Sequence, residues 1–200
     1  MVMADSSALK FLVRRRTTFT WMVPLALLAA TFYWGRWNLI TYLAGAVLLV
    51  LGEVVRFWAA GYIHKDDSVA TGGPYGLVRN PLYFGSLLLA VGFALMSGIG
   101  LPAWVAVIGL FLVFHLAAII SEERFLKQKF GEPYESYLKL VPRLIPMPRF
   151  GRSESTSGEG RGFSMRQAIF NREHTTATVT FLTAIMFLAI ELFRHYRPGF

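Results

Sequence analysis

The sequence predicts an all-α integral membrane protein with about five transmembrane helices and amphipathic helices on the cytoplasmic side. Hydrophobic residues make up 54% of the 200 residues and charged residues only 16%, whereas soluble globular chains carry about 25% charged residues. The apolar residues are gathered in runs close to the roughly 20 residues that an α-helix needs to cross the hydrocarbon core of a bilayer. These two observations exclude a soluble globular protein.

Five runs are expected to span the membrane: residues 18–35, 38–60, 81–98, 102–120 and 175–194. The first run follows a cluster of basic residues, as a secretory signal would. However, it contains Trp21 and Trp34, and no small-x-small cleavage site follows it. We therefore expect it to be retained as a membrane span.

The basic residues predict the orientation. If the N-terminus is cytoplasmic, all but three of the 20 lysines and arginines fall on the cytoplasmic side; the exceptions are Arg36, Arg194 and Arg197. Such a bias is typical of membrane proteins, so the net charge of +8 does not indicate nucleic-acid binding. The long segments 61–80 and 121–174 are then cytoplasmic, and we expect the functional residues there because short turns only connect helices.

Two residue types limit the possible chemistry. The chain has no cysteine, which excludes disulfides, thiolate zinc sites, iron–sulfur clusters and a cysteine nucleophile. The four histidines, His64, His115, His174 and His195, do not have the spacing of metal ligands. We therefore expect no metal site.

The first polar segment, residues 68–85, is rich in glycine and ends in a helix start. Asn80 followed by Pro81 is the usual N-cap and first-turn pair of a helix. By itself this pattern is explained by the beginning of the third span. Alternatively, the free backbone amides at that helix start, with Arg79 beside them, form an anion site for a ligand.

The second polar segment, residues 121–146, begins where the fourth span leaves the lipid. Glu122 and Glu123 stand at that point, an amphipathic helix continues to Phe130, and a short helix with two tyrosines begins at Pro133. Taken alone, this segment predicts an interfacial helix with a solvated charged face.

A helical hairpin is expected to bring the two polar segments together. Residues 81–98 would form about 27 Å of helix, and residues 102–120 return, so both segments reach the same membrane face. Paired carboxylates facing a basic, glycine-rich helix start suit a small zwitterionic ligand with hydroxyl groups. We expect the two segments to form halves of one pocket.

The motifs in these segments follow one another in a specific order. They are Gly73-Pro74-Tyr75, Arg79-Asn80-Pro81-Leu82-Tyr83-Phe84-Gly85, Glu122-Glu123, and Phe130-Gly131 with Tyr134, Tyr137, Val141 and Pro142. This order resembles the isoprenylcysteine carboxyl methyltransferase family over roughly residues 45–148. The resemblance implies a membrane enzyme that binds S-adenosyl-L-methionine without a Rossmann fold, and the sequence has no Gly-x-Gly-x-x-Gly between a strand and a helix. It also implies a hydrophobic or small-molecule methyl acceptor that arrives from the lipid bilayer.

By position, the resemblance implies cofactor contacts at Ser68, Val69, Ala70, Tyr75, Arg79, Asn80, Pro81, Leu82, Tyr83, Glu122 and Glu123. Substrate contacts are expected at His115, Tyr134, Tyr137 and Arg143. His115 could act as a base or proton relay, or it could form a hydrogen bond between helices. Arg143 could equally meet a lipid phosphate. No residue is identified as catalytic.

Two positions depart from the family pattern. Asn80 stands where the family usually has histidine, and an amide cannot be a general base. Methyl transfer needs mainly alignment and exclusion of water, so this change does not remove the chemistry. Ala118 stands where the carboxyl methyltransferases have an arginine that meets the substrate. The nucleophile of the acceptor therefore stays open between carboxylate, thiol, amine and phenol.

The chain is expected to divide into four parts: an N-terminal arm and first span (1–37), a methyltransferase-like core (38–150), a linker with an interfacial helix (151–173), and a C-terminal span (174–200). In the second span, Glu53 and Arg56 lie three residues apart and are expected to pair with each other. The expected location is the plasma or inner membrane if the protein is bacterial, with a cytoplasmic active site.

Three alternatives to a methyltransferase are open. A non-catalytic scaffold could retain the fold. A transporter usually has broken helices at the membrane midplane, whereas the irregular segments here lie at one face. A membrane reductase could share the fold, but a cofactor with two phosphates should require more basic residues than Arg79 and Arg143 provide.

Overall fold

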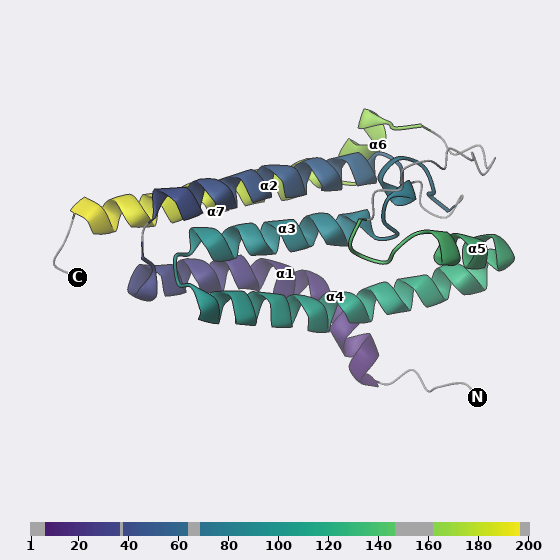
Figure 1. Ribbon diagram of the computed structural model, residues 1–200, viewed down its shortest axis with the longest axis horizontal. Helices are drawn as coiled ribbons and strands as arrows, with labels where there is room; N and C mark the ends of the chain where they lie inside the picture. Colours follow the sequence, from purple (N-terminus) through teal and green to yellow (C-terminus); the bar gives the residue numbers. More distant parts are fainter. Residues whose placement is uncertain (1–6, 37, 64–68, 147–161, 197–200) are drawn as a thin grey trace.

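The computed structural model describes residues 7–36, 38–63, 69–146 and 162–196. These residues fold into helices, with no strand among them: α1 Ser7–Trp34, α2 Leu39–Ala60, the 3-10 helix η1 Gly73–Gly76, α3 Pro81–Met96, α4 Leu101–Phe130, α5 Glu132–Leu140, α6 Met165–Phe170 and α7 Glu173–Tyr196. The long helices α1, α2, α3, α4 and α7 run side by side in one bundle (Figure 1). The predicted all-α class is confirmed.

Three of the described helices are long and apolar enough to cross a membrane: Leu39–Ala60, Leu101–Phe130 and Glu173–Arg194. Two further apolar helical segments, Trp21–Trp34 and Pro81–Met96, are shorter. The predicted number of five spans therefore stays a prediction. Large apolar side chains are exposed on the outside of the bundle, as in a helix bundle surrounded by lipid tails; Ile40 is 78% and Phe181 66% exposed.

Glycines allow α2 and α3 to pack very closely. A Cβ atom on Gly45 would lie 2.6 Å from the carbonyl oxygen of Gly92, and one on Gly52 would lie 2.9 Å from that of Gly85. Larger residues at these positions would push the two helices apart. This contact fixes the position of α3, whose first turn carries the predicted ligand-binding residues.

The last helix belongs to the same bundle. Phe187 of α7 is completely buried, and its ring stacks on that of Phe93 at 5.8 Å between centroids. Before it, α6 is the short helix that was predicted, with Ile169 and Phe170 49% and 75% exposed. Residues 151–161 of the predicted linker lie outside the described residues, and the division of the chain into four parts stays a prediction.

The predicted pair between Glu53 and Arg56 is wrong. Arg56 donates to both carboxylate oxygens of Glu173 at 3.0 and 2.9 Å, and to the hydroxyl of Ser86 at 2.6 Å. Glu53 instead accepts a hydrogen bond from the hydroxyl of Thr180 at 2.6 Å. Both partners on α7 are more than a hundred residues away in sequence, and a two-pronged guanidinium–carboxylate contact is stronger than a single contact along one helix.

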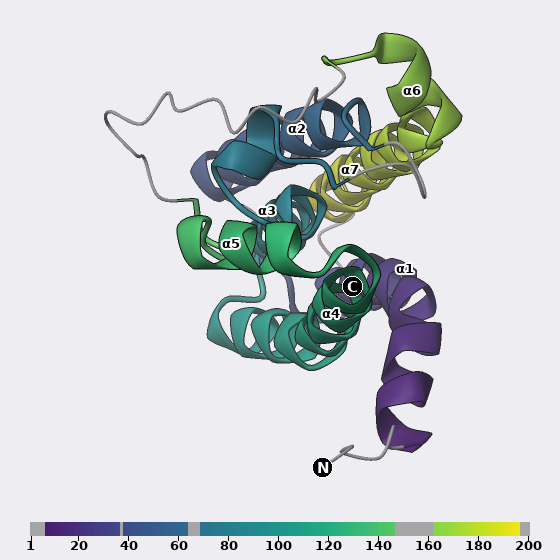
Figure 2. The same cartoon turned by 90° about the vertical axis from the view of Figure 1, so that its right-hand side faces the viewer.

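One end of the bundle carries η1, α5 and α6, and we call it the polar end. The described N-terminal part of α1 also points toward this side, whereas α7 ends at the opposite one (Figure 1). Seen from the polar end, α5 lies across the bundle in front of α3 (Figure 2). The hairpin of α3 and α4 thus brings both polar segments to the same end, as predicted.

Candidate active site

The first turn of α3 meets α4 through Tyr83. Its hydroxyl donates a hydrogen bond to Oε1 of Glu122 at 2.9 Å. The two residues are separated by the whole hairpin, so the contact depends on the lengths of both helices. Tyr83 and Glu122 therefore lie together, as the sequence predicted.

Glu123 is the centre of a buried ion cluster. Its side chain is only 8% exposed and is paired with Arg79 at 3.1 Å and with Arg143 at 2.9 Å. The side-chain amide of Asn80 also lies 3.4 Å from Glu123. Because these partners come from different segments, the cluster ties the start of α3, the segment after α5 and the C-terminal part of α4 together.

Asn80 occupies the N-cap position of α3, as predicted, but its side chain does not cap the helix. The backbone carbonyl of Asn80 accepts from the amide of Phe84 at 3.0 Å. The side-chain amide instead donates to the carbonyl of Arg143 at 2.9 Å. This tertiary contact replaces the local capping bond. Backbone amides in the first turn of α3 therefore do not donate a hydrogen bond to the side chain of Asn80.

The helix α5 holds the glycine-rich segment in place. The hydroxyl of Tyr137 donates to the carbonyl of Tyr75 at 2.7 Å, and the amide of Arg79 donates to the carbonyl of Pro142 at 2.8 Å. Tyr134 is only 3% exposed. Burial raises the pKa of Tyr134 to about 12, and the negative charge of Glu123 adds to it. Burial also raises the pKa of Tyr75 and Tyr137, so all three hydroxyls stay protonated at neutral pH.

A cavity of about 410 Å³ opens between these segments, and we call it the polar-end cavity. Its wall contains most of the residues expected to contact the cofactor: Val69, Ala70, Tyr75, Arg79, Asn80, Pro81, Leu82, Tyr83 and Glu122. Ser68 lies outside the described residues. Glu123 does not line the cavity but supports its wall through Arg79. Tyr134 and Tyr137, expected to meet the substrate, line this cavity as well.

A second cavity of about 340 Å³ lies deeper in the bundle, and we call it the inner cavity. Its lining is mostly apolar and comes from both ends of the chain, including Trp21 of α1 and Thr176 and Thr180 of α7. The two cavities share Leu82, Tyr83 and Glu122. The sequence did not predict this cavity; the only local signal was the group of threonines in the first half of α7, of which Thr176 and Thr180 line the cavity.

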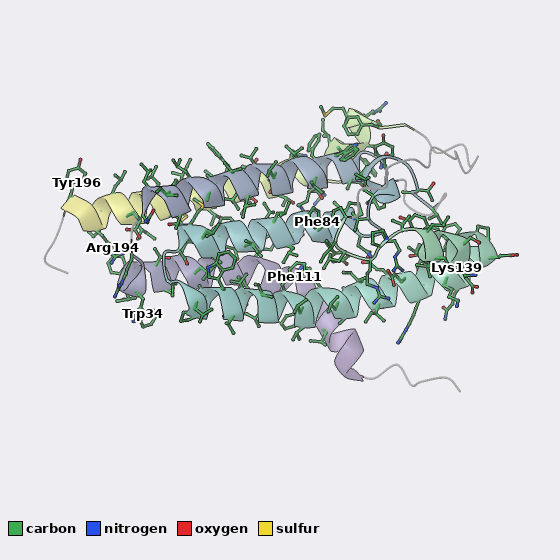
Figure 3. The ribbon with its side chains drawn as sticks, viewed as in Figure 1. Trp34, Phe84, Phe111, Lys139, Arg194 and Tyr196 are labelled. Carbon is green, nitrogen blue, oxygen red and sulfur yellow. The ribbon has the colours of Figure 1, made fainter. Side chains whose placement is uncertain are left out.

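His115 lies in the wall of the inner cavity and not of the polar-end cavity. Its ring stacks on Phe111 at 4.2 Å between centroids and meets the edge of Tyr83 at 5.7 Å. Phe111 lies midway along the bundle, whereas Lys139 of α5 lies at the polar end (Figure 3). Arg143 and the fully buried Ala118 line neither cavity.

The polar-end cavity has the groups that a zwitterionic nucleoside ligand requires. Glu122 offers a carboxylate for ammonium or hydroxyl groups, and Tyr75 offers an aromatic wall. In the part of the chain that the structure describes, Nε of Arg79 is buried without a hydrogen-bond partner. The guanidinium of Arg79, which lines the cavity and is paired with Glu123, provides a positive charge for a ligand carboxylate. The volume is within the usual range of small-molecule sites, roughly 300–1,000 Å³.

The comparisons with known proteins identify the same segment. Residues 39–133 match the phospholipid methyltransferase family model. The cobalt-zinc-cadmium resistance protein CzcN of Cupriavidus metallidurans is 32% identical over 163 residues, which cover 76% of this chain and 73% of that protein. The nickel-cobalt-cadmium resistance protein NccN of Alcaligenes xylosoxydans xylosoxydans is 29% identical over 97% of this chain and 91% of its own length.

The similarity also extends to proteins named as methyltransferases. The protein-S-isoprenylcysteine O-methyltransferase of Schizosaccharomyces pombe is 31% identical over 53% of this chain and 44% of its own length. No solved structure shows significant similarity. The described residues contain no group of three or more His, Cys, Asp and Glu that could hold a metal ion. Similarity over most of one relative, together with the match of residues 39–133 to a methyltransferase family model and the similarity to named methyltransferases, shows that the chain belongs to the isoprenylcysteine carboxyl methyltransferase-like family of membrane methyltransferases, which use S-adenosylmethionine as methyl donor.

Proposed function

We propose that the polar-end cavity binds S-adenosylmethionine, that the inner cavity binds the methyl acceptor, and that the methyl group passes between them beside Tyr83 and Glu122. The observation that carries this proposal is the wall that the two cavities share. A transfer reaction requires two binding sites with a common boundary, because the reacting atoms must come within about 3–3.5 Å of each other.

Different residues of the polar-end cavity contact different groups of the cofactor. Glu122 accepts hydrogen bonds from the ammonium or ribose hydroxyl groups, Arg79 attracts the carboxylate by its positive charge, and Tyr75 packs against the adenine. When bound, the cofactor supplies an electrophilic methyl group on a sulfonium centre. Tyr83 fixes the orientation of Glu122 through their hydrogen bond of 2.9 Å, so the carboxylate does not have to reorganise when the ligand binds.

The inner cavity selects an apolar acceptor and excludes water. Its phenylalanines and leucines offer dispersion contacts but few hydrogen bonds. Trp21, which lines the cavity, is 37% exposed on the outside of the bundle. We infer that the acceptor enters from the lipid beside Trp21, while the cofactor enters from the cytoplasm at the polar end.

Different segments of the chain contribute to the two proposed binding sites. The segment that matches the methyltransferase family contains most of the polar-end cavity, and Trp21, Val23 and Pro24 of α1 with Thr176 and Thr180 of α7 complete the inner cavity. The excess of basic residues on the segments at the polar end supports a cytoplasmic orientation of that end. In a bacterial cell the protein would lie in the inner membrane.

Calorimetry with the purified protein in lipid nanodiscs tests the cofactor site. The wild type should bind S-adenosylmethionine, and Glu122→Gln should bind it roughly ten- to a hundredfold more weakly, because a hydrogen bond to a charged group contributes about 1.5–3 kcal/mol. Glu135→Gln is the matched control, since Glu135 is 45% exposed and lies outside both cavities. The absence of any binding heat for the folded wild type would refute the proposal.

A further inference from the structure

Arg56 of α2 crosses α3 and reaches the wall of the inner cavity. Its side chain passes Gly85, where a Cβ atom would lie only 2.5 Å from Cγ of Arg56. Nη1 of Arg56 donates to the hydroxyl of Ser86 at 2.6 Å and to the carbonyl of Leu82 at 3.4 Å, and both of these residues line the cavity as well. The positive end of Arg56 therefore lies against the space that the methyl acceptor would occupy.

Glu173 of α7 neutralises this guanidinium from outside the cavity. Nη2 of Arg56 donates to the two carboxylate oxygens of Glu173, at 3.0 and 2.9 Å. The side chain of Glu173 is only 9% exposed and does not line the cavity, whereas Thr176, one turn later on α7, does. The positive member of the pair thus lies in the wall and the negative member behind it, so the charge of the guanidinium is already compensated.

This arrangement disfavours an anionic acceptor. A carboxylate in the inner cavity would have to compete with Glu173 for Arg56, and it would share the cavity with the acidic Glu122. Because most of the lining is apolar, a charge without a partner is costly there. An uncharged acceptor carries neither of these costs.

We propose that Glu173, by occupying Arg56, makes the inner cavity select a methyl acceptor that carries no negative charge. This inference rests on the proposed function of the inner cavity. Arg56 belongs to the segment that matches the methyltransferase family, whereas Glu173 lies beyond it. The C-terminal helix thus supplies a specificity-determining residue that acts through Arg56 and does not itself touch the acceptor.

The test compares two compounds that differ in charge but hardly in shape, 4-phenylbutyrate and 4-phenylbutanamide. Their binding to wild type and Glu173→Gln in nanodiscs is measured by calorimetry, with empty nanodiscs as the blank. Wild type should bind the amide roughly tenfold or more tightly than the carboxylate. Glu173→Gln should bind the carboxylate roughly tenfold or more tightly than wild type does, as expected for a hydrogen bond to the released charge of Arg56, and should keep its affinity for the amide.

The ratio of the two affinities separates specificity from a structural effect. A merely structural role of Glu173 would change the affinities for the amide and the carboxylate together and leave their ratio constant. An unchanged ratio in Glu173→Gln, or a wild type that already prefers the carboxylate, would overturn the proposal.

Glu53→Gln is the matched control. Glu53 also joins α2 to α7, since it accepts a hydrogen bond from Thr180 at 2.6 Å, but it does not line the inner cavity. The same substitution at this position should leave the ratio at its wild-type value. An equal gain of carboxylate binding in Glu53→Gln would show that the effect does not come from the release of Arg56, and it would overturn the proposal.

A double variant keeps the proposal open to refutation if Glu173→Gln does not fold. Arg56→Gln combined with Glu173→Gln removes the whole ion pair, a change that proteins tolerate better than the loss of one buried partner. Because Arg56 is neutralised in wild type, the double variant should keep the preference for the amide. Clearly weaker binding of the carboxylate than in wild type would show that Arg56 already binds anions, and it would overturn the proposal.

Further outcomes distinguish this inference from the proposed function. A wild type that binds the amide, combined with an unchanged ratio in Glu173→Gln, would overturn this inference alone. A wild type that binds neither compound would refute the inner cavity as the acceptor site, and this inference with it. Failure of the wild type to bind S-adenosylmethionine would refute only the proposed cofactor site, because the ratio of the two affinities is measured without cofactor.

Discussion

The two cavities differ in the parts of the chain that build them. The polar-end cavity is lined by residues between Ile63 and Tyr137, nearly all inside the segment that matches the methyltransferase family. The inner cavity combines Trp21 near the N-terminus with Thr180 near the C-terminus, both outside that segment. The polar-end cavity is thus contained almost entirely in one continuous segment. The inner cavity is lined mostly by the same segment, and the flanking helices α1 and α7 complete its wall.

This difference indicates how such a fold can change its acceptor. Substitutions on α1 and α7 would alter the inner cavity and leave the polar-end cavity intact. Glu123 with Arg79, and the contact between Tyr83 and Glu122, belong to the segment that matches the family, whereas Arg143 follows that segment. If the two cavities have these separate roles, substitutions that alter only the inner cavity should slow methyl transfer without weakening cofactor binding. Substitutions in the polar-end cavity should weaken cofactor binding.

The largest effect is expected from Glu123→Ala. It would leave Arg79 and Arg143 without their carboxylate, and removal of one partner of a buried ion pair destabilises a protein by about 3 kcal/mol. Thermal unfolding in nanodiscs should show a clear fall in stability, and calorimetry a severe loss of cofactor binding. Glu135→Ala, on the exposed pair with Lys127, should change stability by less than about 1 kcal/mol. Equal stability of the two variants would contradict the role of the cluster.

Ala90→Phe tests whether the inner cavity is separate. Ala90 lines the inner cavity and not the polar-end cavity, so a large side chain there should fill the inner cavity. We expect the rate of methyl transfer to fall roughly thirtyfold, which corresponds to about 2 kcal/mol in the activation free energy. Binding of S-adenosylmethionine, measured by calorimetry, should stay unchanged. Ala106→Phe makes the same change on the exposed side of α4 and should leave both properties intact. A parallel loss of cofactor binding in Ala90→Phe would show that the cavities are not independent.

Tyr83→Phe should affect both cavities, because Tyr83 lies in their common wall. Loss of its hydrogen bond to Glu122 is expected to weaken cofactor binding and to slow methyl transfer by roughly tenfold each, from about 1.4 kcal/mol per lost bond to a charged group. Calorimetry and the methyl-label assay measure the two effects. Tyr33→Phe, at a position that is 73% exposed, is the control. An effect on only cofactor binding or only methyl transfer would contradict a role of Tyr83 in both cavities.

The smallest effect at neutral pH concerns Tyr134. Its pKa is raised by burial to about 12, so the folded protein holds the phenol proton more tightly than the unfolded chain, whose tyrosines titrate near 10. This contribution to stability is complete below about pH 10 and is lost as the pH rises through about 12. Alkaline unfolding should therefore be less steep in Tyr134→Phe than in wild type, while cofactor binding at pH 7 differs little. Identical alkaline unfolding curves would contradict the burial of this hydroxyl.

Much of the polar-end cavity could be predicted from the sequence because its signals are local. The Asn80-Pro81 pair marks the start of α3, and Gly131 marks the end of α4 with a positive φ of 62°. The lengths of the two apolar runs then determine that Tyr83 and Glu122 meet at one end. Once that meeting point is known, the surrounding glycine-rich segment and the two tyrosines of α5 complete the cavity.

The partners of individual side chains could not be predicted in the same way. Arg56 and Glu53 are neighbours along α2, but the rotation of α7 brings Glu173 to the first and Thr180 to the second. Asn80 has the sequence of a helix cap, yet the nearby carbonyl of Arg143 takes its side-chain amide. In each case a residue distant in sequence competes with a local partner, and only the packing of helices decides between them.

The sequence by itself determined that this protein is a helical membrane protein with two polar segments at one end of a helical hairpin, because hydrophobic run length and helix-start signals act over a few turns of chain. The order of motifs in these segments, through its resemblance to a known family, indicated a methyltransferase. Only the tertiary structure decided that α1 and α7 complete an inner cavity, that Glu123 supports the wall while Glu122 lines both cavities, and that His115 lies in the wall of the inner cavity. These features depend on the rotation of each helix against its neighbours, which the close packing of side chains sets and no local pattern records.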